Sequence, residues 1–189
     1  MALTTVPACK AFRSIPGEIQ EHDAELARLI PAVQAFLERE CERTFEQATV
    51  TEYFHGHDWR DRLMVARPPI VSITNLWDDL ARVYATPLSA ASYVIDDADA
   101  GVIRLDGLTF SRGLKNIKVT YVGGFAEIPA DLAQAAMEMV WAAREKGVNN
   151  LVGVRSRSVA DGSVQYVNLG WGGLVDDIVR KYRLHTGVA

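Results

Sequence analysis

The chain has 189 residues, of which 49% are hydrophobic, and its formal net charge is −4. This length and apolar content allow one domain, with or without an arm, and a core that needs neither disulfides nor metals. The acidic balance excludes a strongly basic protein that grips nucleic acid, but not a protein through which DNA passes.

Helix-start residues and helical spacing predict two helices near the N-terminus. Thr5 ahead of Val6-Pro7 is typical of a capped helix start, and this short helix is expected to end near Phe12. A second helix, with Asp23 as its expected cap, is predicted by a stripe of Leu26, Leu29, Ile30, Val33, Leu37 and Cys41. Pro31 lies inside this stripe, so we expect the helix to kink or begin there.

The middle of the chain has a different period. Short β-branched or aromatic runs alternate with Gly, Pro, Asn and Asp, which is typical of strands and turns. Asp99–Gly101 has the composition of a turn between paired strands. Residues 49–125 are therefore predicted to form an antiparallel β-rich section.

A third helix is predicted to open at Ile128–Asp131, where proline suits the first turn and aspartate suits the positive helix end. Gly147 is its expected stop, and Trp141 on it is expected in the core or in a subunit contact. The predicted fold class is α+β: a small helical core of two main helices plus short terminal helices, an antiparallel β-rich middle section and a C-terminal arm. The body is expected over residues 1–150 and the arm over residues 151–189.

The expected arm differs from the body in charge. It holds five basic and three acidic residues, a net +2, whereas residues 1–150 hold 15 basic and 21 acidic residues, a net −6. A short terminal helix is predicted to present Leu174, Ile178 and Tyr182 on one apolar stripe. We interpret it as an arm that docks on another surface, such as a neighbouring subunit, with the alternative that the helix packs back on its own core. The candidate interface residues are Trp171, Leu174, Ile178, Arg180, Lys181, Tyr182 and Arg183.

Motifs that carry chemistry are few. His55 and His57 alternate on an extended segment beside Asp58, so their imidazoles point to the same side and could bind zinc together with the carboxylate. A catalytic zinc site usually needs a third protein ligand. We interpret this segment as a polar hairpin tip and predict no catalytic residue, cofactor or bound metal. The two cysteines, Cys9 and Cys41, are expected to be reduced thiols in a cytosolic product. The sequence shows no signal peptide or membrane span, so we expect no membrane association.

The order of segments resembles the head–tail connector (adaptor) family of long-tailed double-stranded DNA bacteriophages. The resemblance extends over most of the chain in the same order, and it is carried by Asp23–Phe54 with its ending Glu38–Phe45, Arg67–Ile73, Asp106–Phe125, Ile128–Ala136, Ser163–Tyr166 and Leu174–Tyr182. Two departures from the family pattern are Pro31 inside the second helix and a longer segment from Trp77 to Ser92.

The resemblance implies a non-enzymatic structural subunit of the virion neck. It implies a closed ring of identical subunits, a dodecamer in the virion, that lies below the portal protein and docks stopper or tail-completion proteins. DNA would pass through the ring during packaging completion and ejection without sequence-specific binding. The protein would reside in the host cytoplasm during assembly and at the head–tail interface afterwards.

Two other functions remain open from the sequence. One is a tail-completion or stopper protein of the neck, and the other is a small metal-dependent hydrolase using His55, His57 and Asp58. For the ring we also predict that Glu38, Glu40 and Glu42 face the bore, where negative charge would repel passing DNA. The competing interpretation of these glutamates is an ordinary solvated helix face.

Overall fold

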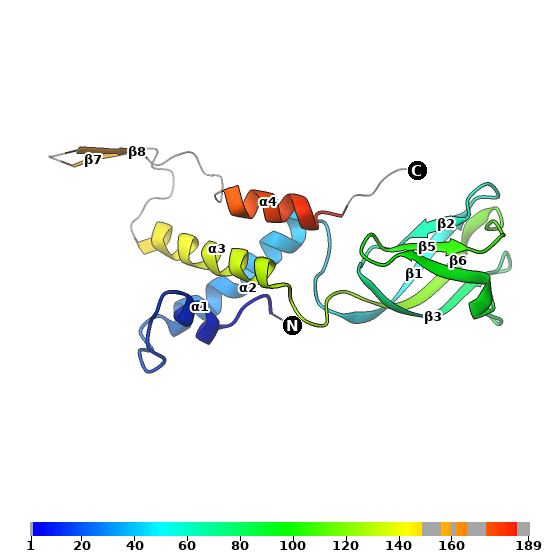
Figure 1. Cartoon of the computed structure of the whole chain (residues 1–189), viewed down its shortest axis with the longest axis horizontal. Coiled ribbons are helices and arrows are strands. Elements are labelled where there is room, and N and C mark those ends of the chain that lie inside the picture. Colours follow the sequence, from blue (N-terminus) through cyan, green and yellow to red (C-terminus); the bar gives the residue numbers. More distant parts are fainter. Residues whose placement is uncertain (1, 149–155, 160–161, 166–172, 185–189) are drawn as a thin grey trace. The chain divides into compact units, whose positions relative to one another are not determined.

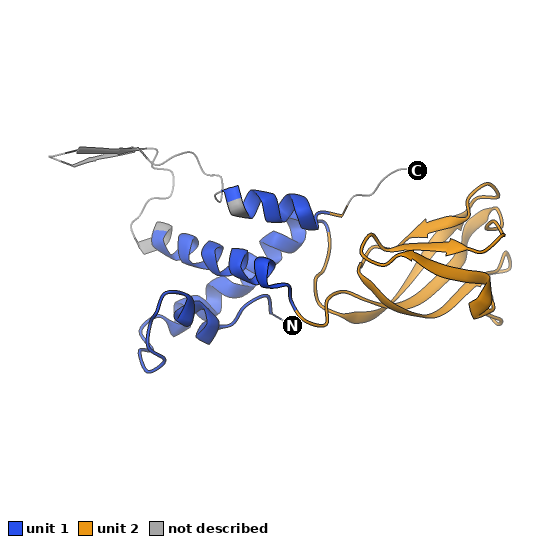
Figure 2. Ribbon diagram, viewed as in Figure 1, with its two compact units in different colours: residues 1–42, 128–183 blue, residues 43–127, 184–189 orange. Residues whose placement is uncertain are grey.

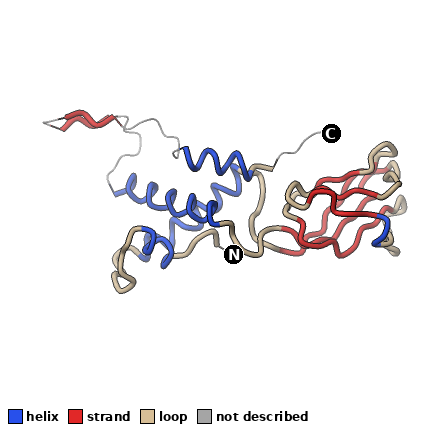
Figure 3. The backbone as a smooth tube through the Cα atoms, in the orientation of Figure 1, coloured by secondary structure: helices blue, strands red, loops and turns tan. Residues whose placement is uncertain are grey.

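The computed structural model describes residues 2–148, 156–159, 162–165 and 173–184. It confirms an α+β fold with a C-terminal helix, in which helices and strands are segregated (Figure 3). The chain forms two compact units, coloured separately in Figure 2: Met1–Glu42 with Ile128–Arg183, and Arg43–Glu127 with Leu184–Ala189. The first is called the helical unit and the second the β unit.

The helical unit contains α1 (Val6–Phe12), α2 (Asp23–Glu40), α3 (Ala130–Val148) and α4 (Gly173–Tyr182), which lie side by side in Figure 1. Their apolar stripes meet in a shared core. Its largest fully buried side chains are Leu26, Leu37, Leu132 and Met139. Trp141 is also buried, at 3% exposed, and its Nε1 donates to the carbonyl of Cys9 over 2.8 Å, which satisfies the indole and ties α3 to α1. No helix in the described part of the chain has the length and apolar character to cross a bilayer.

The helix starts follow the sequence in part. Thr5 caps α1 as predicted, and its hydroxyl accepts from the Ala8 N–H over 3.3 Å. The predicted cap of α2 was wrong: His22 is the cap residue, without a side-chain cap bond, and Asp23 is helical and accepts from Lys10 instead. The helix begins at Asp23 and continues past Pro31, so the proline does not mark its start.

The C-terminal helix packs on its own chain. Val175, Ile178 and Tyr182 of α4 are buried in the helical unit, at 1%, 5% and 8% exposed. The structure therefore matches the alternative in which the stripe of this helix covers its own core. The division into a body over residues 1–150 and an arm over residues 151–189 stays a prediction.

The β unit consists of two antiparallel three-stranded sheets, ordered β1-β6-β3 and β2-β5-β4. The strands are β1 (Ala48–Gly56), β2 (Arg62–Met64), β3 (Ile70–Asp78), β4 (Tyr93–Asp97), β5 (Val102–Leu105) and β6 (Gly113–Gly123), and a single 3-10 turn, η1 (Ala90–Ser92), precedes β4. Strand residues and neighbouring loop residues enclose one apolar core, which includes Leu63, Leu76, Ile103, Ile117, Val119 and Tyr121 from the strands and Val65 and Phe110 from the loops. The β4–β5 turn places Gly101 at φ +77°, as the predicted Asp99–Gly101 turn requires.

A further hairpin lies between α3 and α4 in sequence. Its strands β7 (Ser156–Val159) and β8 (Gly162–Gln165) pair antiparallel, from Ser156 with Gln165 to Val159 with Gly162. They form a two-stranded sheet of their own.

Candidate interaction surfaces

The histidine-rich segment forms the end of β1 and the turn that follows. His55 Nδ1 accepts from the backbone N–H of Lys115 over 3.0 Å, which joins β1 to β6. The ring of His57 lies 5.7 Å from that of Trp59. Within the described ranges, no three His, Cys, Asp or Glu side chains are placed to share one metal ion. The first histidine therefore has a structural contact, and the second helps to position a tryptophan.

Trp59 is the most unusual side chain of this turn. It is 65% exposed, and the guanidinium of Arg60 lies 4.4 Å from its ring centroid. Trp59 lines three neighbouring clefts of about 450, 600 and 870 Å³. Tryptophan and arginine are the residues most enriched at the energetic centres of protein interfaces. The sequence did not identify Trp59, although a tryptophan beside an arginine in a polar turn was a usable signal.

The smallest of these clefts has an apolar floor and a basic rim, and we call it the Trp59 cleft. Its apolar side chains are Phe54, Trp59, Leu63, Met64, Val102, Phe110 and Ile117. Its charged residues are Arg60, Asp61 and Arg62. Asp61 already accepts from Arg104 Nε over 2.8 Å, and this hydrogen bond holds the pKa of Asp61 below its ordinary value. Arg62 lies 3.9 Å from the same carboxylate, so the charged residues that line the cleft carry a net charge of about +1.

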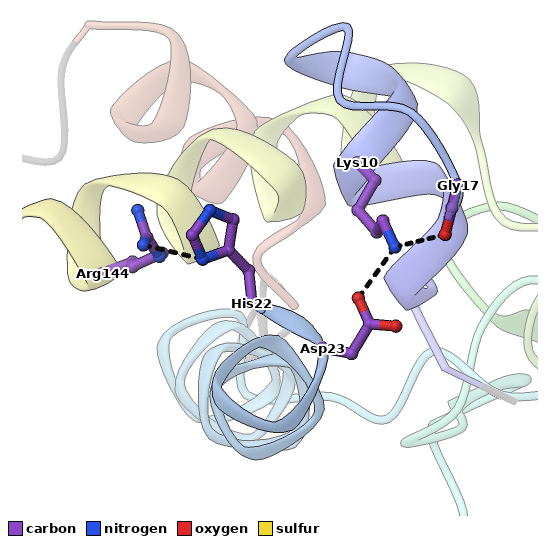
Figure 4. A network of polar contacts seen from close by, with 5 residues as sticks. All are labelled: Lys10, Gly17, His22, Asp23 and Arg144. Carbon is purple, nitrogen blue, oxygen red and sulfur yellow. Dashed lines mark hydrogen bonds and ion pairs between the residues drawn. The ribbon is translucent and has the colours of Figure 1, made fainter. Parts of the chain in front are cut away.

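The loop between α1 and α2, residues 13–22, has the opposite character. It is exposed along nearly its whole length, and Ile19 at 43% exposed stands between the exposed Glu18 and Glu21. The buried Lys10 holds this loop: its Nζ donates to the Gly17 carbonyl over 2.8 Å and to Asp23 Oδ1 over 2.9 Å (Figure 4). We call residues 13–22 the acidic loop.

The other side of the acidic loop is held by α3. His22 Nδ1 lies 3.0 Å from a terminal nitrogen of Arg144, as Figure 4 shows, and Arg144 Nε also pairs with Glu25 over 3.0 Å. The loop therefore has a fixed exit as well as a fixed entry. A segment whose shape is set before binding loses less conformational entropy when it meets a partner.

The candidate interface residues of the C-terminal helix fall into two groups. Ile178 and Tyr182 are buried in the helical unit, whereas Arg180, Lys181 and Arg183 are exposed. Asp131 accepts from Lys181 Nζ over 2.6 Å and from the Tyr182 hydroxyl over 2.8 Å, and Glu42 accepts from Arg183 over 2.7 Å. These bonds fasten α4 to α3 and to the end of α2. Leu174 belongs to α4, and Trp171 lies outside the described residues.

The three glutamates expected at the bore lie at the end of α2 and just beyond it. Glu38 accepts from Gln34 over 3.2 Å, Glu40 pairs with Arg39 over 3.1 Å, and Glu42 pairs with Arg183. Two of the three negative charges thus have a neighbouring cation. Glu42 also adopts a positive φ of 54°, which turns the chain out of the helix.

The chain thus has two compact units, one helical and one of small antiparallel sheets, with an exposed aromatic cleft and an acidic loop. The chain belongs to the head completion protein family, whose sequence model matches residues 2–152. This membership confirms the resemblance to phage connector and completion proteins. Among curated protein sequences, none matches this chain.

Solved structures show the same fold. A chain in the neck of the empty gene transfer agent particle, computed with C6 symmetry, has a TM-score of 0.58 and 18% identity over 94% of this chain and 88% of that chain. A chain in the neck of the native particle, computed with C12 symmetry, has a TM-score of 0.55 and 20% identity over 87% and 84%. A chain in the native virion has a TM-score of 0.53 and 20% identity over 88% and 80%.

Proposed function

We propose that this protein is a structural, non-enzymatic subunit of the virion neck that forms a ring below the portal and docks stopper or tail proteins. The observation that carries the proposal is the family match over residues 2–152. The similar folds found in necks with sixfold and twelvefold symmetry support a ring of identical copies. A dodecamer at the head–tail interface, assembled from subunits made in the host cytoplasm, is the form we propose.

A ring of this kind serves as a conduit for DNA during packaging completion and ejection. The net charge of −4 supports passage without retention, because each contact between a cation and a phosphate adds salt-dependent affinity that would slow the DNA. Glu38, Glu40 and Glu42 are proposed to contribute negative charge near the path. Their partners Arg39 and Arg183 reduce this charge, so the repulsion is weak and falls further as salt rises.

The docking arm is proposed to be the segment between α3 and α4. Antiparallel helices such as α3 and α4 can be joined by a few residues, yet residues 149–172 separate them here. Connections of this length in compact proteins are usually functional. We propose that this segment, with the β7–β8 hairpin and Trp171, docks on the portal or a neighbouring copy, while α4 anchors its far end.

Electron microscopy of the purified full-length protein, alone and mixed with portal particles, tests the proposal. We expect closed rings of identical subunits, or such rings seated on the portal. Light scattering should give a mass many times that of one chain under the same conditions. A protein that stays monomeric in both experiments would contradict the ring, and one that binds only tail particles would favour a stopper or tail-completion role.

A further inference from the structure

We propose that the acidic loop of one copy inserts Ile19 into the Trp59 cleft of the next copy, and that this contact joins neighbouring subunits of the ring. The inference rests on the proposed ring and names its interface. Both surfaces are exposed within their own units, and they differ from each other. When two copies join through two different surfaces, each copy keeps one unused surface for the next copy. Such a head-to-tail contact produces a closed ring or a filament.

The apolar parts of the two surfaces are complementary. Ile19 is a large apolar side chain that is 43% exposed, in a turn of the acidic loop closed by the bond from its N–H to the Pro16 carbonyl. The Trp59 cleft has a volume of about 450 Å³, and the apolar side chains that line it include Phe54 and Leu63. Removing both from water is favourable, at roughly 25 cal/mol for each Å² of apolar surface buried.

The charges are complementary as well. Glu18 and Glu21 flank Ile19, and Arg60 and Arg62 flank the cleft. The only carboxylate among the described lining residues, Asp61, is already engaged by Arg104. Arg62 lies 3.9 Å from Asp61 and 3.7 Å from Asp96, so the glutamates of the loop would share its charge with these two carboxylates. Such pairs at an interface rim fix its register and speed association.

The loop is also prepared for binding. Lys10, at 4% exposed, fixes both Gly17 and Asp23, and backbone bonds from Ile19 to Pro16 and from Asp23 to Gln20 shape the turns between them. In the described part of the chain, no atom lies within 4 Å of a Cβ added at Gly17, so the loop is open at this residue. A rigid loop and a formed cleft together reduce the entropic cost of association.

Disulfide trapping between differently tagged full-length copies tests the contact. One copy carries Ile19→Cys, and the other carries Met64→Cys or, at a second place in the cleft, Val102→Cys. The native Cys9 and Cys41 are buried, and burial raises the pKa of Cys9, so both should react slowly. We expect a disulfide-linked pair with one copy of each tag when rings are oxidised. The matched control is Val71→Cys, 52% exposed on β3 outside the cleft, which should give no such pair.

Substitutions supply an independent readout. We expect Ile19→Asp to weaken ring formation about tenfold or more, as loss of an interface hot spot does, whereas Val71→Asp leaves it unchanged. Arg60→Glu with Arg62→Glu should also weaken it, and adding Glu18→Arg with Glu21→Arg should restore it in part. Thermal unfolding of each variant separates an interface effect from misfolding. If a variant unfolds at the same temperature as wild type, its loss of ring formation is an effect on the interface.

Three outcomes would overturn the inference. In the first, rings form, but neither cleft cysteine is trapped by Ile19→Cys more than the Val71→Cys control is. In the second, a single copy that carries both cysteines forms the disulfide only within its own chain. In the third, Ile19→Asp forms normal rings. In each case wild-type rings in the neck would still support the proposed function. Failure of the wild-type protein to form any ring would instead contradict the proposed function itself.

Discussion

The Tyr182 hydroxyl donates to Asp131 over 2.8 Å, so the last residue of α4 is bonded to the first turn of α3. Asp131 also accepts from Lys181 and from the N–H of Leu132. Partial burial raises the pKa of Asp131, but the bonds from Lys181 and Tyr182 outweigh it, and the pKa lies below its ordinary value. This carboxylate is therefore the point at which α4 is fastened to the helical unit.

The first prediction concerns this fastening at acid pH. A carboxyl group whose pKa is lowered by folding adds stability above its unfolded pKa of about 3.9, and that stability is lost as pH falls through the folded value. We expect Asp131→Asn to lower the unfolding temperature at pH 7 and to show a smaller further loss than wild type below about pH 4. Thermal unfolding followed by circular dichroism from pH 7 to pH 2 measures both. An equal loss in both proteins at acid pH would contradict the role of Asp131.

The second prediction separates α4 from the segment before it. Truncation after Gly147 removes Val175, Ile178 and Tyr182 from the core, so we expect the helical unit to lose cooperative unfolding or to unfold at a clearly lower temperature. Replacing residues 149–172 by a short Gly/Ser linker keeps α4, and we expect the unfolding temperature to stay near that of wild type. If residues 149–172 dock on the portal, the linker variant should fold like wild type but should not bind portal particles. A truncated chain as stable as wild type would show that α4 is dispensable for the fold.

Local signals in the sequence predicted the helices and strands well, because caps and periodicity act over a few residues. Thr5 is an example, since its partner Ala8 is three residues away. Asp23 was expected as a cap for the same local reason, but Lys10, thirteen residues earlier, recruits it. The apolar stripe with Ile178 and Tyr182 was also predicted. Because such a stripe can pack in any apolar groove, the sequence did not determine whether it packs on its own chain or on another protein. Trp59 is 65% exposed, and the polar residues around it in the sequence were the one local signal for this exposure.

The third prediction concerns alkaline pH in the β unit. Tyr121 is fully buried, accepts from the Arg67 N–H over 3.0 Å and donates to Glu52. Burial first, and then the Glu52 carboxylate, raise the pKa of Tyr121 far above its ordinary value. A raised acid pKa adds stability below the unfolded value of about 10, and this stability is lost as pH rises beyond it.

We therefore expect the β unit to lose stability above about pH 10. Tyr121→Phe should be less stable at pH 7 by about 1 kcal/mol or more, because Glu52 and the Arg67 N–H each lose a partner, but its further loss at high pH should be smaller. Denaturant unfolding at pH 7 and pH 11 compares them. Tyr53→Phe, at a half-exposed tyrosine of the same unit, is the control and should follow wild type. A Tyr121→Phe protein with the full alkaline loss would contradict the prediction.

The fourth prediction compares two glycines with left-handed backbones. Gly124 has φ +100°, and an added Cβ would lie 2.8 Å from the Glu46 carbonyl carbon, against backbone that cannot easily move. Gly107 has φ +66°, and nothing lies within 4 Å of such a Cβ. We expect Gly107→Ala to cost about 1 kcal/mol through backbone strain alone, and Gly124→Ala to cost several times more. Chemical unfolding of the two variants measures the difference, and equal costs would show that the strands near Gly124 can separate.

The last prediction tests the glutamates proposed to face the DNA path. Changing Glu38, Glu40 and Glu42 to Gln removes three charges, two of which already have arginine neighbours on the surface. Exposed pairs of this kind contribute between 0 and about 1 kcal/mol, so the variant should fold and assemble. Near the bore, the missing repulsion should slow ejection at low salt, and the difference should disappear at high salt because the field is screened. Ejection rates from particles carrying the variant, measured from 10 mM to about 500 mM salt, decide the matter. The control changes Glu138, Asp176 and Asp177 to their amides, which removes equal charge elsewhere on the helical unit. If both variants eject like wild type at every salt concentration, these glutamates form an ordinary solvated surface; if both slow equally, net charge rather than position sets the rate.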